Sequence, residues 1–262
     1  MENSHPLFKR RLTYFLITAF FLVGTVCAVL FFLLNVRVST VDLENCYYSD
    51  KASVLAAADI KMGTHSYAID KDKISSAIME QNPYVTDVRI KRTGISSLTI
   101  TLTEDAPRFY IEYGGNYLIL SETLRVLGVY STKEEYAHLS VYPIKLIPVE
   151  SAEIGHTLVF AEGYEDKGKE CISLLSQISE CELSGTITYA DVSERFDIRL
   201  TYKDKYELRF GSPRNFGDKL ALVIETIEFL ENPENGYSKA KGIIRASVNG
   251  ETSFEPTGAV EE

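Results

Sequence analysis

The residues 163–169, GYEDKGK, have the glycine and lysine spacing of a loop that cradles phosphate groups. Such a loop needs a serine or threonine directly after its lysine to bind magnesium, and Glu170 stands at that place. Glu165 and Asp166 would also repel a phosphate group. We therefore interpret this stretch as a surface loop before a helix, with no bound nucleotide.

Other residue types that carry out catalysis or bind metals are scattered along the chain. The four histidines do not pair with one another or with a cysteine at the spacing of metal ligands: His5, His65, His138 and His156. No serine lies in a Gly-x-Ser-x-Gly nucleophile elbow. Glu104 and Asp105 are adjacent carboxylates, which favours a solvated hinge over an acid/base pair facing one cleft. The sequence predicts no enzyme, no metal site, no cofactor and no small-molecule substrate.

The four cysteines do not suggest a disulfide framework. Cys27 lies inside a long apolar run, which leaves Cys46, Cys171 and Cys181, an odd number. If Cys171 and Cys181 share one helix, ten residues separate them by about 15 Å, which is too far for a bridge.

The apolar run covers residues 12–34, LTYFLITAFFLVGTVCAVLFFLL, and contains no charged residue. As a helix it is about 35 Å long, enough to cross a hydrocarbon core of roughly 30 Å. Lys9, Arg10 and Arg11 precede it and only Arg37 follows closely, so the positive-inside rule predicts a cytoplasmic N-terminus and an extracytoplasmic remainder. A cleaved signal peptide is the alternative, but the run is too long and no small-x-small site follows it.

Charge limits the partners of the extracytoplasmic part. The chain has a net charge of −10, of which residues 1–37 contribute +3, so the remainder carries −13. This acidic balance disfavours attraction of the whole domain to nucleic acid or to an anionic lipid surface. The sixteen tyrosines mostly fit strands, although aromatic side chains are also common in recognition surfaces.

Residues 36–105 show a β-α-α-β-β order. The residues Val36, Val38, Val41 and Leu43 favour a first strand because β-branched side chains are common in strands. Two further strands are expected from apolar residues that alternate on one face, namely Val88 and Ile90 in one and Leu98, Ile100 and Leu102 in the other. Asn45 stands where a turn needs a left-handed residue. We expect Ser49 to cap the first helix and Asp70 to cap the second, which must end before Pro83.

Residues 106–256 are mainly strands with two helices. RFYIEY and YLIL flank a hairpin at residues 114–116, and a second hairpin crosses Lys203, Asp204 and Lys205. Phe196, Ile198 and Leu200 are expected on one face of that second hairpin. Apolar residues at helical spacing predict helices over 166–179 and 216–230 that pack on the sheet. Asn249-Gly250 predicts a last hairpin between residues 243–248 and 252–254.

The chain resembles the FtsQ/DivIB family of bacterial cell-division proteins, in the stretches VSTVDLEN, SDKASVLAAADIKMGTHSYAID, KISSAIMEQNPYVTDVRIKR and SSLTITLTEDAPRFY. Its more specific parts are Asn-Pro-Tyr-Val at residues 82–85 and Glu104-x-x-Pro107. The resemblance implies an α+β chain with five parts: a cytoplasmic N-terminus (1–11), a single transmembrane helix (12–34), a POTRA domain (36–105), a mainly β domain with two helices on its sheet (106–256), and a short tail (257–262).

The resemblance also implies a function and partners. Members of the family are non-enzymatic scaffolds of the division septum, and their β domain binds FtsB/DivIC-like and FtsL-like membrane proteins through strands near its C-terminal end. A terminal edge strand exposes backbone groups that another chain can complete. The candidate binding residues are Ile243, Ile244, Ser247 and Val248, with Phe254 as an apolar anchor. The two isoleucines fit a core strand equally well.

A second function class stays open at this point. The same anchor could hold a cell-wall enzyme or an envelope ligand receptor, which would need a cleft with convergent polar groups. No such set of residues is evident in the sequence.

Overall fold

The computed structural model describes residues 5–34, 36–237, 239–247 and 249–257, with backbone alone for residues 5–13 and 32–34. The chain forms two compact units, which divide between Glu104 and Asp105. The whole is a mixed α+β structure, as predicted, with one apolar helix at its N-terminal end. The two units are described separately below.

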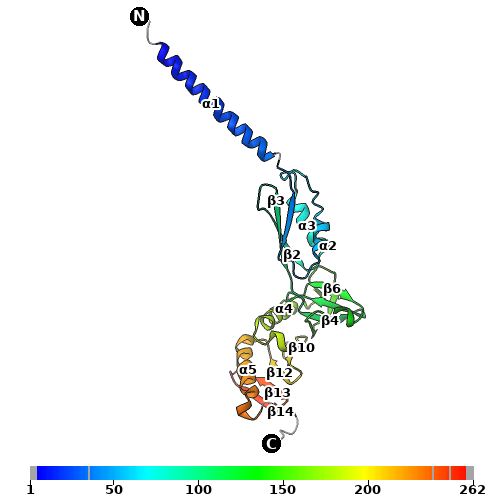
Figure 1. Cartoon of the computed structure of the whole chain (residues 1–262). Coiled ribbons are helices and arrows are strands. Elements are labelled where there is room, and N and C mark those ends of the chain that lie inside the picture. Colours follow the sequence, from blue (N-terminus) through cyan, green and yellow to red (C-terminus); the bar gives the residue numbers. More distant parts are fainter. Residues whose placement is uncertain (1–4, 35, 238, 248, 258–262) are drawn as a thin grey trace. The chain divides into compact units, whose positions relative to one another are not determined.

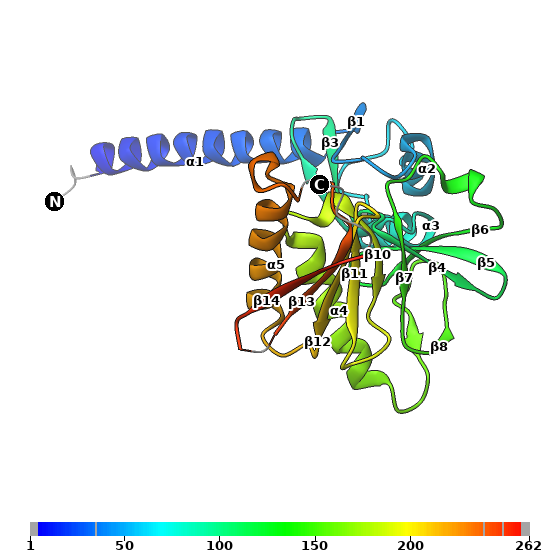
Figure 2. The same cartoon turned by 90° about the horizontal axis from the view of Figure 1, so that it is seen from below.

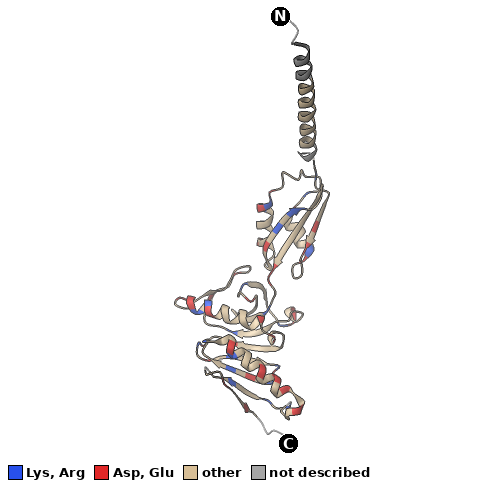
Figure 3. Cartoon of the chain, turned by 90° about the vertical axis from the view of Figure 1, so that its left-hand side faces the viewer, with Lys and Arg blue, Asp and Glu red and all other residues tan. Residues whose placement is uncertain are grey.

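Helix α1 (His5–Leu34) has no charged residue in its sequence after Arg11. Its stretch Tyr14–Phe31 is long and apolar enough to span a membrane, and no part of it is buried against the rest of the described chain. The hydroxyls of Thr18 and Thr25 donate to the carbonyl oxygens of Tyr14 and Phe21, at 2.9 and 2.8 Å, so these polar groups are satisfied within the helix. The described side chains of α1 include no charged group (Figure 3). This helix is a candidate membrane span.

The first unit continues as a three-stranded sheet of order β1-β3-β2, with two helices on one face (Figure 1). Its elements are β1 (Thr40–Glu44), α2 (Lys51–Ala58), α3 (Lys71–Gln81), β2 (Val85–Arg92) and β3 (Ser97–Glu104). Strand β1 pairs in parallel with β3, and β2 pairs with β3 antiparallel. The core lies between the sheet and the helices and includes Val54, Ile78, Val85, Ile100 and Leu102. The predicted β-α-α-β-β order is confirmed.

The helix caps agree with the prediction in one case and shift by one residue in the other. The carboxylate of Asp70 accepts a hydrogen bond from the backbone N–H of Lys73 at 3.1 Å, which confirms the predicted cap. Asp50 caps α2 by accepting from the N–H of Ser53 at 2.9 Å, so the prediction of Ser49 was wrong. The backbone N–H of Ser49 is instead bound by Glu104 at 3.0 Å.

The first strand begins later than predicted. Val36 and Val38 lie in an extended segment before β1 because their backbone groups bond to the loop over residues 63–66 rather than to a strand. Asn45, directly after β1, has a φ of 57°, the left-handed conformation predicted for it.

The second unit is built on a nine-stranded sheet of order β14-β13-β12-β11-β10-β7-β4-β5-β6. Its strands are β4 (Phe109–Tyr113), β5 (Asn116–Leu120), β6 (Val126–Tyr130), β7 (Tyr142–Lys145), β10 (Ile187–Asp191), β11 (Ile198–Tyr202), β12 (Tyr206–Gly211), β13 (Gly242–Ala246) and β14 (Thr252–Pro256), with a separate pair β8 (Val149–Ser151) and β9 (Val159–Phe160). Helices α4 (Glu165–Glu180) and α5 (Phe216–Glu231) lie on one face of the sheet (Figure 2).

Both helices of the second unit match the predicted positions. The buried face of α4 includes Cys171, Leu174 and Ile178, and that of α5 includes Leu220 and Ile227. One continuous core of buried residues joins the helices to the sheet. Lys219 is also buried, at 2% exposure, where its ammonium group donates to the carbonyl oxygens of Phe210 and Ser212 at 2.8 Å each. These bonds connect the start of α5 to the end of β12.

Phe196, predicted to lie on one strand face with Ile198 and Leu200, is not part of the strand. It is 75% exposed because β11 begins only at Ile198, so the prediction that it shares their face was wrong. The hairpin between β11 and β12 turns through the three residues Lys203, Asp204 and Lys205, as predicted, and Lys203 and Asp204 have left-handed φ values of 49° and 52°. Phe196 lies in the loop before β11, outside the paired residues of that strand.

The short strand β7 was not predicted from the sequence. It pairs with β4 only at Tyr142 and Pro143, and with β10 only at Ile144 and Lys145. A four-residue strand that contains proline gives a weak periodic signal. Strand β7 therefore joins the two parts of the large sheet through two residue pairs on each side.

Glu104, at the end of β3, holds the loop that leads into α2. Its Oε2 accepts from the N–H groups of Tyr47 and Tyr48 at 2.6 and 2.8 Å, and its Oε1 accepts from the N–H of Ser49 at 3.0 Å. Partial burial raises the pKa of Glu104, but the hydrogen bonds from Ser49, Tyr48 and Tyr47 lower it by more, so the net pKa is below its ordinary value. The prediction of a solvated hinge was wrong for this residue.

This geometry predicts that Glu104→Gln destabilises the first unit by about 1–3 kcal/mol at pH 7, because an amide cannot accept all three bonds. A lowered folded-state pKa means that the carboxylate stabilises the unit above its unfolded pKa of about 4.3, and that this contribution is lost as the pH falls through the folded value. The difference between wild type and variant should therefore shrink in acid.

Hydrogen exchange of the amides over residues 45–58, measured on the detergent-solubilised full chain near pH 7 and pH 4, tests this expectation. Asp105→Asn is the matched control, because no hydrogen bond or ion pair of Asp105 is seen among the described residues. Equal protection in wild type and Glu104→Gln at neutral pH would contradict the assigned role.

Candidate functional site

The last hairpin of the chain, β13 and β14, lies at one edge of the nine-stranded sheet. It forms where Asn249-Gly250 predicted a turn, and Gly250 has a φ of 79°, a conformation that favours glycine. The turn is closed by the N–H of Ser247, which donates to the carbonyl oxygen of Glu251 at 2.8 Å. Strand β13 pairs with β12 on its other side, so β14 is the edge strand.

The outer edge of β14 presents backbone groups to the surroundings. The N–H of Ser247 donates to the carbonyl oxygen of Glu251, and the N–H of Thr257 donates to the carbonyl oxygen of Lys241. The backbone N–H and C=O groups of the odd-numbered residues of β14 therefore point toward β13. In an antiparallel ladder the alternate residues point the other way. The N–H groups of Thr252 and Phe254 therefore point outward, and Pro256 has no N–H to offer. No strand of the described chain pairs with this edge.

The predicted binding residues occupy different places in this hairpin. Ile243 is partly exposed on the face of the sheet away from the helices, and Ser247 is exposed at the turn. Ile244 is fully buried in the core, so it cannot contact a partner in this conformation and takes the alternative role that the sequence left open. Val248 lies outside the described residues. The hairpin thus does not bring these residues together on one face.

Phe254 lies on the helix face of the edge. Its ring makes edge-to-face contacts with Tyr206 and Tyr237, with centroid distances of 5.9 and 6.3 Å. Its neighbour Thr252 shares a hydrogen bond of 2.8 Å with Thr226 of α5. Tyr206 is fully buried whereas Phe254 is partly exposed, so Phe254 forms the border between the core and the surface.

The face of the sheet away from the helices carries a ladder of three arginine–carboxylate pairs near the edge, whose charges cancel. Arg199, Arg209 and Arg245 lie directly opposite one another on β11, β12 and β13. Each is paired with a carboxylate, respectively Asp197, Glu207 at 2.7 Å and Glu255 at 3.2 Å. The hydrogen bond from Arg199 lowers the pKa of Asp197, so this acid stays ionised at neutral pH. The Arg245–Glu255 pair extends the ladder to the edge strand.

Gly242 allows β14 to approach β13 closely. A Cβ atom at this position would lie 2.4 Å from the carbonyl oxygen of Glu255 and 2.6 Å from the ring of Phe254. Neither neighbour is a flexible side-chain end, so any larger residue would displace β14. The sequence did not reveal this constraint at Gly242. Thr252 and Glu255 were also not among the predicted site residues, although their place in the strand after Asn249-Gly250 could have indicated them.

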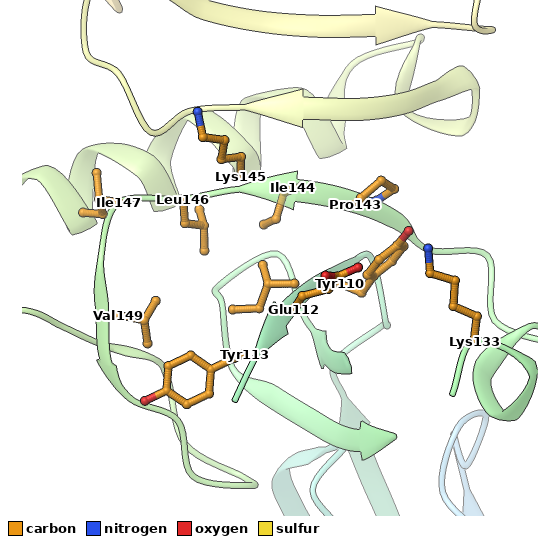
Figure 4. A pocket seen from close by; sticks show the side chains of 11 residues that line it. Tyr110, Glu112, Tyr113, Lys133, Pro143, Ile144, Lys145, Leu146, Ile147 and Val149 are labelled. Carbon is orange, nitrogen blue, oxygen red and sulfur yellow. The ribbon is translucent and has the colours of Figure 1, made fainter. Parts of the chain in front are cut away.

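The largest pocket found in the second unit, of about 550 Å³, lies where β4 and β7 diverge (Figure 4). The polar side chains that line it are Tyr110, Glu112, Tyr113, Lys133 and Lys145, and the hydroxyl of Tyr113 already donates to the carbonyl oxygen of Glu150 at 2.8 Å. A hydrogen bond with Asp191 at 3.2 Å raises the pKa of Lys145, so its amine stays protonated and is a poor base. Lys133 lies over the ring of Tyr117, 5.5 Å from its centroid. A pocket is what the alternative function, an enzyme or a receptor, would need. The polar side chains that line this pocket do not include a nucleophile hydrogen-bonded to a base.

The other chemically suggestive residues have structural surroundings. Glu165 accepts from the N–H of Gly163 at 3.2 Å, so it occupies a backbone donor that a phosphate-binding loop would offer to its ligand. Burial raises the pKa of the Cys171 thiol to about 11, which disfavours the reactive thiolate. Within the described part of the chain, no group of three His, Cys, Asp or Glu side chains could hold a metal ion.

Comparison with known proteins finds a match to a family model in the part of the chain after α1. A family model described as "POTRA domain, FtsQ-type" matches residues 36–105. This span contains strands β1 to β3 and helices α2 and α3.

Two relatives extend the similarity to most of the chain. The cell division protein FtsQ of Corynebacterium glutamicum is 23% identical over 209 residues, which cover 79% of this chain and 85% of that protein. The cell division protein DivIB of Clostridium acetobutylicum is 21% identical over 193 residues, which cover 74% of this chain and 73% of that protein.

A solved structure also aligns with part of the chain. It is the major extracytoplasmic domain of the trans isomer of the bacterial cell division protein DivIB from Geobacillus stearothermophilus. The alignment covers 45% of this chain and 87% of that chain, at 16% identity and a TM-score of 0.28.

The close approach at Gly242 yields a prediction for the hairpin. Gly242→Val should displace β14 and speed hydrogen exchange over residues 251–257, while exchange in α4 stays as in wild type. Gly185→Val is the matched control, because nothing lies within 4 Å of a Cβ built there. Unchanged protection of β14 in Gly242→Val would show that the strand adapts without leaving the sheet.

Proposed function

We propose that this chain, a relative of the FtsQ/DivIB cell-division proteins that carries an FtsQ-type POTRA domain, is a single-pass scaffold of the bacterial division machinery. Two relatives named as cell division proteins align with three quarters or so of its length, which supports a role in division. The scaffold acts at the septum by holding other membrane proteins and carries out no reaction of its own.

The proposal places the N-terminus in the cytoplasm and both folded units outside. Helix α1 supplies a span with no charged side chain over residues 12–34. Lys9, Arg10 and Arg11 precede this span, and the positive-inside rule keeps such residues on the cytoplasmic side.

The free edge of β14 is the observation that supports partner binding most directly. An extended segment of another chain can pair with the outward N–H groups of Thr252 and Phe254 and so add a strand to the sheet. Its side chains would then lie next to Phe254 on the helix face and next to Ser253 and Glu255 on the charged face.

The opposite edge of the same sheet is covered where β6 begins, whereas no strand of the described chain pairs with the outer side of β14. Strand β6 has bridges from the loop over residues 154–157, and its Val126 bonds with His156 and Gly155 at 2.9 and 2.8 Å. Proteins usually cover or disrupt a free edge to avoid aggregation. The outer side of β14 is left open at the other end of the sheet from the covered start of β6, and this difference supports a docking function for β14.

The proposed partners are FtsB/DivIC-like and FtsL-like membrane proteins. Of the residues predicted to bind them, Ile243, Ser247 and Phe254 are accessible at or beside the edge. Thr252 and Glu255 join them on the basis of the strand register. Ile244 supports the hairpin from the core instead.

Replacing Thr252 with proline tests the strand-addition proposal. Thr252→Pro removes one outward N–H and adds a ring that clashes with a paired strand, while the bonds from β14 to β13 stay in place. We expect capture of division-protein partners from mildly solubilised membranes to fall about tenfold or more, the equivalent of roughly 1.4 kcal/mol.

Thr252→Val is the matched control. It also loses the side-chain bond to Thr226 but retains the backbone N–H, so it should bind partners as wild type does. Both variants should melt cooperatively near the wild-type temperature. Equal partner capture by wild type and a folded Thr252→Pro would rule out pairing along this edge.

A reporter that is active only outside the cytoplasm, fused after residue 262, tests the orientation. We expect activity from this fusion, and loss of activity when Lys9, Arg10 and Arg11 are replaced and arginines are added after Arg37. A wild-type fusion that reports a cytoplasmic C-terminus would overturn the proposed scaffold.

A further inference from the structure

The segment that leaves the membrane helix is bonded directly to two loops of the POTRA domain. Helix α1 ends at Leu34, two residues before Val36. The described residues 36–39 make these backbone bonds to the loops: Ser66 N–H to Val36 O at 3.0 Å, Val38 N–H to Thr64 O at 2.9 Å, Gly63 N–H to Val38 O at 2.8 Å, and Ser39 N–H to Ser96 O at 2.8 Å. The loops over residues 59–69 and 93–96 therefore belong to the end of the domain where the chain emerges.

These two loops expose apolar side chains that the domain does not cover. Met62, Tyr67 and Ile95 are 63%, 59% and 70% exposed, and we call them the emergence patch. An exposed group of large apolar side chains next to polar residues is typical of a binding surface.

Basic residues accompany the emergence patch. Arg37 donates to the carbonyl oxygen of Gly63 at 3.2 Å, Lys61 is exposed in the same loop, and Arg92 ends β2 beside the second loop. Asp59, Asp70 and Asp72 are the acidic residues at this end, and Lys71 and Lys73 stand beside them in the first turn of α3. The carboxylate of Asp70 is bound to the backbone of α3. The local charge is thus slightly positive, although the extracytoplasmic part as a whole is acidic.

Chain length fixes the depth of these loops if α1 spans the bilayer, as the proposed function requires. Two residues extend at most about 7 Å, whatever angle the domain makes with the helix. The headgroup layer on each side of the hydrocarbon core is roughly 5–8 Å thick. The carbonyl oxygen of Val36, and the loop bonded to it, therefore lie within or at the surface of that layer.

We infer that the emergence patch inserts into the headgroup region of the outer leaflet and is a lipid-binding surface of the POTRA domain. Tyrosine prefers this depth because its ring is apolar and its hydroxyl is polar. Met62 and Ile95 lose water contact there, and Arg37, Lys61 and Arg92 lie where lipid phosphates are found. The partner is thus the phospholipid of the membrane that the chain itself spans, and the contact orients the domain on that surface.

Tryptophan substitution tests this surface because the chain has no tryptophan. Full-length Tyr67→Trp is reconstituted in phosphatidylcholine nanodiscs with or without lipids that carry a nitroxide quencher near the headgroup. We expect quenching about twofold or more above that of Tyr47→Trp, together with blue-shifted emission. Tyr47 is a matched exposed tyrosine, at 76%, that follows the far end of β1, a strand about 17 Å long.

A third variant separates failure of this inference from failure of the membrane anchor. Phe20→Trp, in the middle of α1, should be quenched by lipids with a nitroxide deep in the acyl chain. Strong quenching of Phe20→Trp with equal, weak quenching of Tyr67→Trp and Tyr47→Trp would overturn the lipid contact alone. Absence of quenching in Phe20→Trp would overturn the membrane anchor, and the lipid contact with it.

Discussion

Removing the apolar surface of helix α1 from water is the requirement on which the rest of the structure depends. The described side chains of this helix are uncovered by the remainder of the chain, and Phe20 alone is 77% exposed. Burying a side chain of this size stabilises by roughly 2 kcal/mol, and a bilayer supplies such burial along the whole helix. The two folded units are then held at a membrane surface, which confines their diffusion toward other membrane proteins to two dimensions.

Backbone hydrogen bonds fix both ends of the POTRA domain. At one end, Val36 and Val38 bond to the loop that bears Met62, and at the other end the carboxylate of Glu104 binds three successive N–H groups. Bonds of the second kind are charge-assisted and therefore stronger than bonds between neutral groups. The segment after α1 and the loop before α2 are thus both held to the rest of the domain by hydrogen bonds of the main chain.

The elements that could be predicted are those whose cause lies within a few residues. Asp70 caps its helix with its own side chain, and Asn249-Gly250 turns because of its own backbone preference, so both were visible in the sequence. Glu104 acts on residues more than fifty positions away, and β7 exists because β4 and β10 flank it. The free edge of β14 likewise depends on the order of the strands, which the local pattern does not contain.

The small number of outward donors limits what strand addition at β14 can contribute to binding. Thr252 and Phe254 offer two N–H groups, and these two residues with Pro256 offer three C=O groups. Each hydrogen bond adds only about 0.5–1.5 kcal/mol, so even all five contribute no more than roughly the cost of bringing two proteins together. In the proposed docking, backbone pairing would therefore set the register of a partner, while apolar contact at Phe254 and the charges at Arg245 and Glu255 would supply much of the affinity. Anchoring both proteins in one membrane would raise their effective concentration, which compensates for an edge this short.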